Sequence, residues 1–435
     1  MANRDDELNK RQRQRAAAQK KRRKEQLMMR RRLTLAVMLL ILCALAIWAL
    51  TKDMPRPEPD AQLAETTEYT EEATRPKEEP VTTIHIKAAG DLNVTDAVVS
   101  SGLTSLGYDF TEAFLDVASL MSDADLTMLN FEGNLVGEPY GSMRASAPQQ
   151  LAEAMNAMGV DLVQMANSYA IHNGMIGLSQ TLNNIRAAGM EPVGAFSTPA
   201  EFESSKGFTI CNVRGISVAV VAFTKGMDGL GLPSGSEDCV NLLFTDYDTT
   251  YSDIDKDGIR AVLRAAQSEK PDVTIALLHW GSAYNDIIFE VQEDIVELMQ
   301  KEGVDIILGS HPHLLHEIKF DDVKNTLIAY SLGDFYGDAE KGGTNYSIIL
   351  DIEISKDNDA GVTEIVGYSV TPIYTLKEGE TKDSQRRVVR IRDTMAAYDV
   401  NFVDKVTKEA YESMDNSLER IEARIHPNAG ESDEE

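Results

Sequence analysis

Over residues 82–375, apolar runs of strand length alternate with segments of helical periodicity. Runs such as "ISVAVVAFT" (216–224) and "DVTIALLHWG" (272–281) are almost continuously apolar, as expected of strands buried on both faces of a sheet. Segments such as "IRAVLRAAQSEK" (259–270) have the spacing of amphipathic helices. Beyond residue 325 the strand-like runs follow one another with little helix between them. This order predicts an α/β fold with two mixed β-sheets packed together and helices outside.

Charge is unevenly distributed along the 435 residues, whose formal net charge is −28. Residues 1–32 contain 13 Lys and Arg against 4 Asp and Glu, a charge of +9, so the remaining chain carries −37. A chain this acidic is not expected to bind nucleic acid by neutralising phosphates. The basic segment could be an RNA-binding tail, but the apolar run that follows it favours the cytoplasmic flank of a membrane helix.

The run "LTLAVMLLILCALAIWAL" (33–50) contains no charged residue. As a helix it would span about 27 Å, close to the ~30 Å hydrocarbon core of a bilayer. Three arginines (30–32) precede it, and Trp48 lies near its far end, where interfacial aromatic residues belong. We therefore predict a single-pass transmembrane helix at 33–50 in the cell membrane, with residues 1–32 in the cytoplasm and the main domain outside. A cleaved signal peptide is the alternative.

Three further segments complete the predicted organisation. Residues 51–80 are rich in Pro, Glu and Thr and poor in large apolar residues, which is typical of a disordered spacer. Residues 81–375 form the predicted main domain. Residues 376–435 are predicted to be a charged extension with one helix and an acidic tail.

Two cysteines lie in the main domain. Cys211 and Cys239 could form a disulfide in an oxidising exterior. Cys211 lies in the strand-like run "FTICNV", however, which favours a buried apolar residue without a disulfide.

Polar residues follow the apolar runs at the points where the strands would end. In α/β folds, ligands bind where the carboxyl ends of strands converge. Carboxylate, amide and imidazole groups together suit divalent Mn, Zn or Fe, and a pair of such ions can activate water and bind a phosphoryl group. The candidate residues are Asp91, Asn130, Glu132, Asn134, Asn167, Ser168, Tyr169, His172, Asn173, His279, His311, His313 and Asp334.

Each candidate also has a purely structural interpretation. Asp91 after "AAG" is typical of a turn or helix cap, and His279 of a hydrogen-bonded core histidine. In "HPH" (311–313), an extended backbone would point both rings to one side, because side chains alternate. The set favours a site more strongly than any member does, because independent turn residues need not all be ligand types. The other histidines are interpreted as structural or left without a role: His85, His316 and His426.

The chain resembles the CapA family of poly-γ-glutamate capsule biosynthesis proteins over about residues 83–375. The resemblance is carried by "AAGDLNV", "ADLTMLNFEGNL", "ANSYAIHNGMIGLSQTLNNIRAAGMEPVGA", "LLHWGSAYN", "VDIILGSHPHLLHEI" and "AYSLGDF". It implies a calcineurin-type metallophosphoesterase fold, an α/β/β/α sandwich, with two divalent ions (Mn, Zn or Fe). The implied metal ligands are Asp91, Glu132, Asn167, His279, His311 and His313, and the implied substrate-binding residues are Asn130, Trp280 and Asp334.

The chain departs from the family pattern at one motif. The family has Asn-Asn-His followed three residues later by Asp, whereas this chain has Asn167, Ser168, Tyr169 and His172. In related phosphoesterases the missing His would protonate the leaving group, and a tyrosine, with an unperturbed pKa near 10, is a poorer proton donor at neutral pH. Tyr169 and His172 are the predicted catalytic residues, His172 only if its loop bends back. The family's "SLGNF" is "SLGDF" here, which places a carboxylate at Asp334.

Three functions are compatible with these features. The first is a membrane-anchored assembly factor that acts with other subunits in the synthesis or export of poly-γ-glutamate or a related surface polymer. The second is a metal-dependent phosphoesterase or related hydrolase of an envelope substrate. The third is a degenerate domain that only binds partners. The anchor, the spacer and the altered motif favour the first, whereas the retained ligand set motivates the second.

A domain this acidic would repel an anionic polymer, so contact would need a bound cation or a local basic patch. The dense basic cluster outside the N-terminal segment is "SQRRVVRIR" (384–392). It gives a candidate contact strip, with an ordinary charged strand edge as the alternative: Arg386, Arg387, Arg390 and Arg392.

Overall fold

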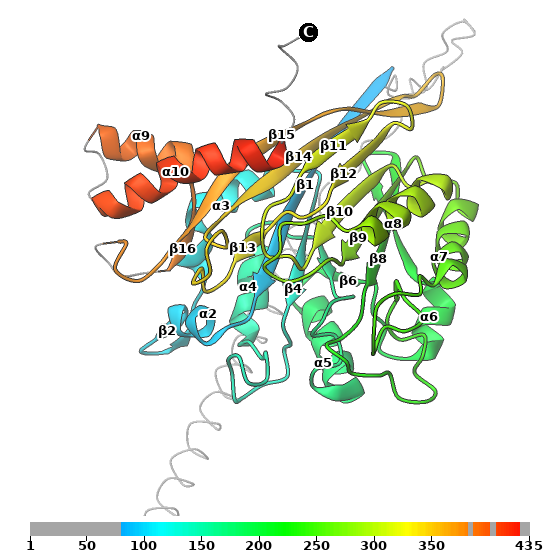
Figure 1. Cartoon of the computed structure of the whole chain (residues 1–435), viewed down its shortest axis with the longest axis horizontal. Coiled ribbons are helices and arrows are strands. Elements are labelled where there is room, and N and C mark those ends of the chain that lie inside the picture. Colours follow the sequence, from blue (N-terminus) through cyan, green and yellow to red (C-terminus); the bar gives the residue numbers. More distant parts are fainter. Residues whose placement is uncertain (1–79, 382–385, 401–405, 427–435) are drawn as a thin grey trace, which may run out of the picture. The chain divides into compact units, whose positions relative to one another are not determined.

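Two mixed β-sheets, packed face to face, occupy the centre of the part of the chain that the computed structural model describes, residues 80–381, 386–400 and 406–426 (Figure 1). The first sheet has the order β16-β15-β14-β1-β4-β5-β6, with β13 beside β1. Strands β1, β4, β5 and β6 are parallel to one another, and β14, β15 and β16 continue the sheet in antiparallel fashion. Its strands are β1 (Val81–Asn93), β4 (Leu126–Glu132), β5 (Leu162–Gln164), β6 (Glu191–Val193), β13 (Asp334–Tyr336), β14 (Tyr346–Asp357), β15 (Val362–Leu376) and β16 (Arg387–Arg390).

The second sheet has the order β11-β12-β10-β9-β8-β7. Strands β8, β9, β10 and β12 are parallel, and the two edge strands are antiparallel. Its strands are β7 (Phe208–Val213), β8 (Ile216–Thr224), β9 (Val273–His279), β10 (Ile306–Ser310), β11 (Ile318–Asp321) and β12 (Thr326–Ala329). A short hairpin, β2 (Leu103–Thr104) and β3 (Gly107–Tyr108), is separate from both sheets.

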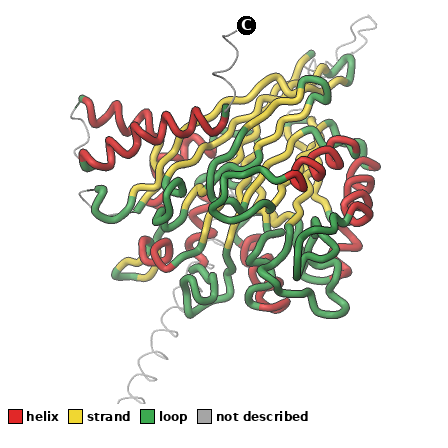
Figure 2. Tube along the Cα trace, viewed as in Figure 1, coloured by secondary structure: helices red, strands yellow, loops and turns green. Residues whose placement is uncertain are grey.

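Helices flank the strands on both sides (Figure 2). Helices α7 and α8 pack on one face of the second sheet, and α10 contacts β14 and β15 of the first. The described helices are α2 (Asp96–Ser101), α3 (Thr111–Ser122), α4 (Gln149–Ala157), α5 (Gly174–Ala187), α6 (Pro199–Ser205), α7 (Lys256–Ser268), α8 (Glu290–Lys301), α9 (Ile391–Asp399) and α10 (Lys408–Ile425).

Strand β8 is buried on both faces, as its continuous apolar run predicts. Val218 and Val220 belong to the core cluster that the two sheets share, whereas Val221 and Phe223 pack in a second cluster with α7 and α8. The assignment alternates because successive side chains of a strand point to opposite faces. The prediction of a mixed α/β fold with sheets flanked by helices is therefore confirmed.

Helix α7 illustrates how the sequence sets a boundary and a buried face. The Asp255 side chain accepts a hydrogen bond from the Gly258 N–H and caps the first turn, which offsets one of the unpaired amides of a helix N-terminus. The buried residues recur at intervals of three and four, the period of one helix face. They are Ile259, Val262, Leu263 and Ala266.

The C-terminal extension differs from the prediction of one helix. Residues 387–390 form β16, which pairs with β15 of the first sheet, and α9 precedes α10. The sequence pattern did not predict this strand, because the buried residues Val388, Val389 and Ile391 are interspersed with arginines.

Two other predictions concern the membrane and the cysteines. The predicted transmembrane helix lies outside the described residues, and within them no helix has the length and hydropathy to span a bilayer. Cys211 and Cys239 are both free thiols; Cys211 is half-buried and Cys239 is buried.

Candidate metal centre

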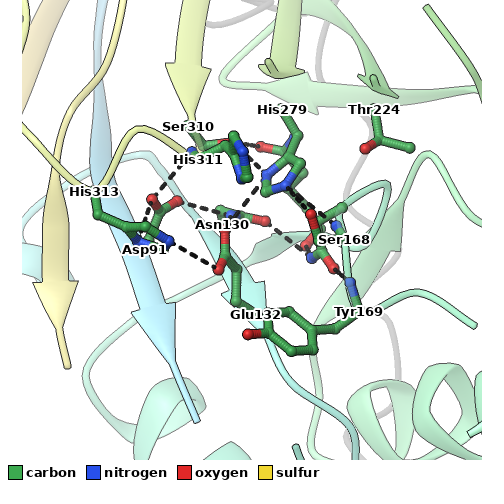
Figure 3. Close-up of polar contacts among 12 residues, drawn as sticks. Asp91, Asn130, Glu132, Ser168, Tyr169, Thr224, His279, Ser310, His311 and His313 are labelled. Carbon is green, nitrogen blue, oxygen red and sulfur yellow. Dashed lines mark hydrogen bonds and ion pairs between the residues drawn. The ribbon is translucent and has the colours of Figure 1, made fainter. Parts of the chain in front are cut away.

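The predicted ligand residues lie together where parallel strands of both sheets end (Figure 3). The register of β1 places Asp91 opposite Asn130 of β4 on one side and Asp334 of β13 on the other. His279 is the last residue of β9, and His311 directly follows β10. Long-range strand pairing therefore assembles residues that are far apart in the sequence.

Asn130 holds the two central carboxylates together. Its Nδ2 donates hydrogen bonds to Asp91 Oδ1 at 2.7 Å and to Glu132 Oε1 at 3.2 Å. The backbone N–H of His311 donates to Asp91 Oδ2 at 3.1 Å. Burial raises the pKa of Asp91 to about 6 and raises the pKa of Glu132 well above its usual value, because an isolated charge is poorly solvated there.

His279 is oriented by Ser168, one of the three residues that depart from the family pattern. The Nε2 atom of His279 accepts a hydrogen bond from the Ser168 backbone N–H at 3.2 Å and lies 3.1 Å from Ser168 Oγ. Its Nδ1 atom lies 3.4 Å from Glu132 Oε1. Burial lowers the pKa of His279 well below its usual value, so the ring is neutral and Ser168 and Glu132 fix its orientation.

His313 is the cation of the cluster. Its Nδ1 atom lies 2.7 Å from Asp334 Oδ1 and 3.4 Å from Asp91 Oδ2, and its Nε2 atom lies 3.7 Å from Glu132 Oε2. Burial acts to lower the pKa of His313, but the charges of these carboxylates outweigh it and raise the pKa to about 10. In the metal-free protein, a protonated His313 thus offsets part of the buried negative charge.

Two groups of side chains offer donor atoms at distances suited to a divalent ion. They are Glu132–His279–His311 and Asp91–Glu132–His313, with the donor atoms of each group within 4.8 Å of one another. Within the described part of the chain, Nδ1 of His311 is buried without a hydrogen-bond partner, a costly state for a polar atom that coordination would relieve. The donor chemistry and this unpartnered atom fit a divalent metal, and Glu132 belongs to both groups.

The backbone of the His-Pro-His segment differs from the predicted extended conformation. His311 has φ +91° and His313 has φ +58°, conformations that residues other than glycine rarely adopt. The two rings still lie in the same cluster, with centroids 6.0 Å apart. Strained backbone of this kind is common at functional sites.

Asn167 is buried beside this cluster. Its Nδ2 donates to Asn130 Oδ1 at 3.0 Å and to the Phe131 carbonyl at 2.8 Å, and its Oδ1 accepts from the Tyr169 N–H at 3.0 Å. The amide therefore positions Asn130 and the turn after β5, and its role as a metal ligand stays a prediction.

Of the two predicted catalytic residues, Tyr169 lies at the cluster and His172 lies outside it. The Tyr169 ring is half-buried beside Glu132 (Figure 3). Burial, followed by the charge of Glu132, raises the pKa of the Tyr169 hydroxyl. His172 is exposed, its Nε2–H donates to the Met143 carbonyl at 3.3 Å, and its ring centroid lies 5.7 Å from that of Tyr169. The loop therefore does not turn His172 into the cluster.

Trp280 corrects the prediction of a substrate-binding residue. Its indole N–H donates to the Tyr330 carbonyl at 2.9 Å, and the two rings stack in the core cluster with α7 and α8. Successive residues of an extended segment point to opposite faces, so Trp280 faces the helices when His279 faces the cluster. Asn130 and Asp334, in contrast, both lie in the cluster.

Two of the four arginines of the candidate polymer-contact strip are buried, and the other two are paired with acids. Arg386 is buried and donates to the Gly337 and Asp338 carbonyls and to Glu378. Arg387 is also buried. Arg390 donates to the Asp116 carbonyl and pairs with Asp393, and Arg392 lies 3.8 Å from Glu422. The strip matches the alternative of a structural strand edge.

Two residues near the site were not predicted. Lys225 directly follows β8, and its Nζ donates to the Gly281 carbonyl at 2.9 Å. Tyr284 stacks on His313 with a centroid distance of 4.9 Å. The strand-end rule that selected the other residues would also have selected Lys225, whereas Tyr284 lies in a loop that no pattern marks.

Solved structures offer distant likenesses only. A calcineurin-like phosphoesterase, YfkN, of Bacillus subtilis is 15% identical with a TM-score of 0.41, covering 67% of this chain and 91% of that one. A phosphatase of Mycoplasma pneumoniae is 12% identical with a TM-score of 0.41, covering 68% of this chain and 94% of that one. Nothing about the site follows from likenesses at this level.

Sequence relatives are more informative. The capsule biosynthesis protein CapA of Bacillus anthracis is 25% identical over 270 residues, which cover 60% of this chain and 62% of that protein. The PGA biosynthesis protein CapA of Bacillus subtilis (strain 168) is 24% identical over 270 residues, covering 59% and 66%. A probable polyglutamine synthesis accessory protein of Mycobacterium tuberculosis is 22% identical over 306 residues, covering 69% and 78%. The chain thus spans slightly less than two thirds of the length of either CapA protein. The family model of the bacterial capsule synthesis protein PGA_cap matches residues 85–339, more than half of the chain, and the chain therefore belongs to this family.

Proposed function

We propose that this chain acts in the synthesis or export of poly-γ-glutamate or a related capsule polymer, as a membrane-anchored protein whose folded domain lies outside the cytoplasm and contains a divalent metal centre. One observation carries the metal centre: two donor groups share Glu132, and the buried Nδ1 of His311, a member of the first group, lacks a hydrogen-bond partner among the described residues. The names of the relatives support the polymer. The apolar run at 33–50 supports the anchor, and the partners would be other subunits of the polymer synthase or export complex.

The residues that would hold the metal are Asp91, Glu132, His279, His311 and His313. A divalent ion bound there would supply a Lewis acid for an anionic oxygen of the substrate. Asn130 fixes the spacing of Asp91 and Glu132, and Ser168 fixes the His279 ring. The burial of all five residues excludes bulk water and strengthens electrostatic interactions within the site.

A metal-dependent phosphoesterase of an envelope substrate is the second candidate, and the same donor set favours it. The residues available for proton transfer weigh against efficient turnover. Burial raises the pKa of the Tyr169 hydroxyl, and His172 is exposed and hydrogen-bonded to the Met143 carbonyl, outside the cluster. A degenerate domain that only binds partners is the third candidate, and an absence of bound metal would favour it.

Elemental analysis of the purified full-length chain tests the metal centre. We expect about two equivalents of transition metal, and loss of metal in His311→Ala. The matched control is His316→Ala, because His316 is also a buried histidine, but its Nε2–H donates to the Asn285 carbonyl outside the donor groups. An absence of metal in the wild type after reconstitution with Mn²⁺, Zn²⁺ and Fe²⁺ would refute the metal centre.

Polymer production separates the first function from the second. In producing cells, we expect the double variant His311→Ala and His313→Ala to abolish polymer assembly, and His316→Ala to preserve it. Metal-dependent turnover of phosphoesters by the purified chain, together with normal polymer assembly in the double variant, would instead favour the phosphoesterase.

A further inference from the structure

Two lysines lie beside the carboxylate–histidine cluster: Lys225 directly follows β8, and Lys341 lies in the loop between β13 and β14. We propose that Lys225 and Lys341 bind the carboxylates of a polyanionic strand that crosses the cluster over Tyr284. This inference rests on the proposed function, because it names how the same site would recognise its polymer.

Lys225 is fixed at the β9 side of the cluster. Its backbone N–H donates to the His279 carbonyl at 2.8 Å, and its Nζ donates to the Gly281 carbonyl at 2.9 Å. Thr224, the residue before it, pairs with His279 in the second sheet, which places Lys225 at that half of the site. An ammonium has three N–H donors, and the Gly281 carbonyl uses one of them.

Lys341 lies above the other half of the cluster. Its Nζ is 3.2 Å from the centroid of the Tyr284 ring, and the same ring stacks on His313. The Tyr284 backbone N–H donates to the Pro312 carbonyl at 2.9 Å, which ties the ring to the His-Pro-His segment. Tyr284 has φ +60° and a residue exposure of 42%. A cation–aromatic–imidazole stack thus reaches from solvent to the buried carboxylates.

The two lysines stand out because the chain is strongly acidic. Neither lysine forms an ion pair with a carboxylate of the described residues, and the arginines of the 386–392 segment are buried or paired with acids. A polyanion approaching so acidic a domain needs local positive charge. Lys225 and Lys341 supply it at the cluster itself.

The form of the contact favours a polycarboxylate over a single phosphoryl group. A lysine ammonium is a compact point charge. Lys225 lies beside His279, and the Lys341 ammonium lies over the Tyr284 ring that stacks on His313. Two separate single charges match a strand that carries one negative charge per residue. One phosphoryl group would instead be bound most strongly by donors that converge on the same point.

Binding of a fluorescent γ-linked decaglutamate to the metal-loaded full-length chain, followed by anisotropy, tests the proposal. We expect Lys341→Gln to weaken binding about two- to fivefold, as for an exposed charge pair, and Lys225→Met about tenfold, because a partly buried charged contact is stronger. Lys341→Arg should retain binding. The weakening should shrink at high salt, which screens the exposed contact.

Lys270→Gln is the matched control. Lys270 is exposed and precedes β9, whose far end carries His279, and a strand of this length separates them by about 20 Å. Unchanged binding by both Lys341→Gln and Lys225→Met would overturn the proposal, and so would binding of inorganic phosphate with no binding of decaglutamate. Measuring bound metal in each variant keeps the two ideas distinct: metal with lysine-independent binding refutes only this inference, whereas an absence of metal in the wild type refutes the proposed metal centre.

Discussion

Replacing His313 by glutamine should destabilise the metal-free protein more at neutral pH than at pH 5. The imidazolium contacts three buried carboxylates, those of Asp334, Asp91 and Glu132. Glutamine retains a polar side chain of similar size but removes the charge. The variant therefore leaves buried negative charge without its cation.

The magnitude follows from the burial of both partners. Removing one member of a buried ion pair usually costs about 3–5 kcal/mol, and we expect this loss at pH 7.5. Burial raises the pKa of Asp91 to about 6 and also raises the pKa values of Glu132 and Asp334. An acid whose pKa is raised on folding favours the folded state below its unfolded pKa, and this contribution is lost as the pH rises through the folded pKa. At pH 5 Asp91 binds a proton, so the loss of the His313 charge should cost less.

Urea unfolding of the chelator-treated full-length chain, followed by circular dichroism at both pH values, gives the two free energies of unfolding. Asn241→Ala is a suitable control, because Asn241 is buried and its side-chain amide donates to the Gly207 and Ala222 carbonyls. The free energy of unfolding that Asn241→Ala loses should depend little on pH. Equal losses at pH 5 and 7.5 for His313→Gln, or a larger loss at pH 5, would refute the assignment of His313 as the cation of the cluster.

Three other substitutions separate the site from its surroundings. Ser168→Ala should weaken metal binding about 10- to 100-fold, as loss of a ligand-orienting group does, and metal titration of the folded variant would measure this. Trp280→Phe should lower the free energy of unfolding by about 1–3 kcal/mol through the lost hydrogen bond without changing bound metal; a loss of metal would return Trp280 to the site. Arg386→Ala should lower the free energy of unfolding by about 2–4 kcal/mol, because the buried guanidinium donates hydrogen bonds to two carbonyls and to Glu378. Decaglutamate binding measured in parallel should be unchanged.

The fold was largely predictable because its central strands are buried on both faces. Continuous apolar runs such as residues 216–224 have few other stable locations than a covered sheet. Strand β16 was not predictable in the same way, because arginines flank its two buried apolar residues, Val388 and Val389, and interrupt the apolar run. Arg386 and Arg387 are buried and bonded within the fold, and the letters alone do not distinguish such arginines from a basic surface.

The site was predictable in membership but less so in detail. The parallel strands β1 and β4 bring Asp91 and Glu132 together at one end of the first sheet, and β9 of the second sheet brings His279 to them, as the convergence of strand ends predicts. The face of a residue next to a strand end depends on register and bend, which explains the wrong assignment of Trp280. The loop residue Tyr284 was not predicted at all. It reaches His313 through a positive-φ turn, and no periodic pattern predicts such a turn.

Restoring the family's histidine, by Tyr169→His, tests whether proton transfer limits this chain. Burial and the charge of Glu132 raise the pKa of the Tyr169 hydroxyl above its usual value, so it holds its proton too tightly to protonate a leaving group near neutrality. Histidine, with a pKa near 6.5, could do so, and a placed general acid usually contributes about 10²–10⁴-fold.

If the metal centre hydrolyses phosphoesters, Tyr169→His should therefore raise turnover at least about tenfold for an alkyl phosphate, whose leaving group needs a proton. Turnover of p-nitrophenyl phosphate should change much less, because its leaving group departs as an anion. Bound metal, measured in both proteins, must be equal for the comparison to hold. No gain on the alkyl ester at equal metal content would mean that leaving-group protonation is not what this chain lacks. The altered motif would then fit a protein that binds its polymer at the metal centre without cleaving it.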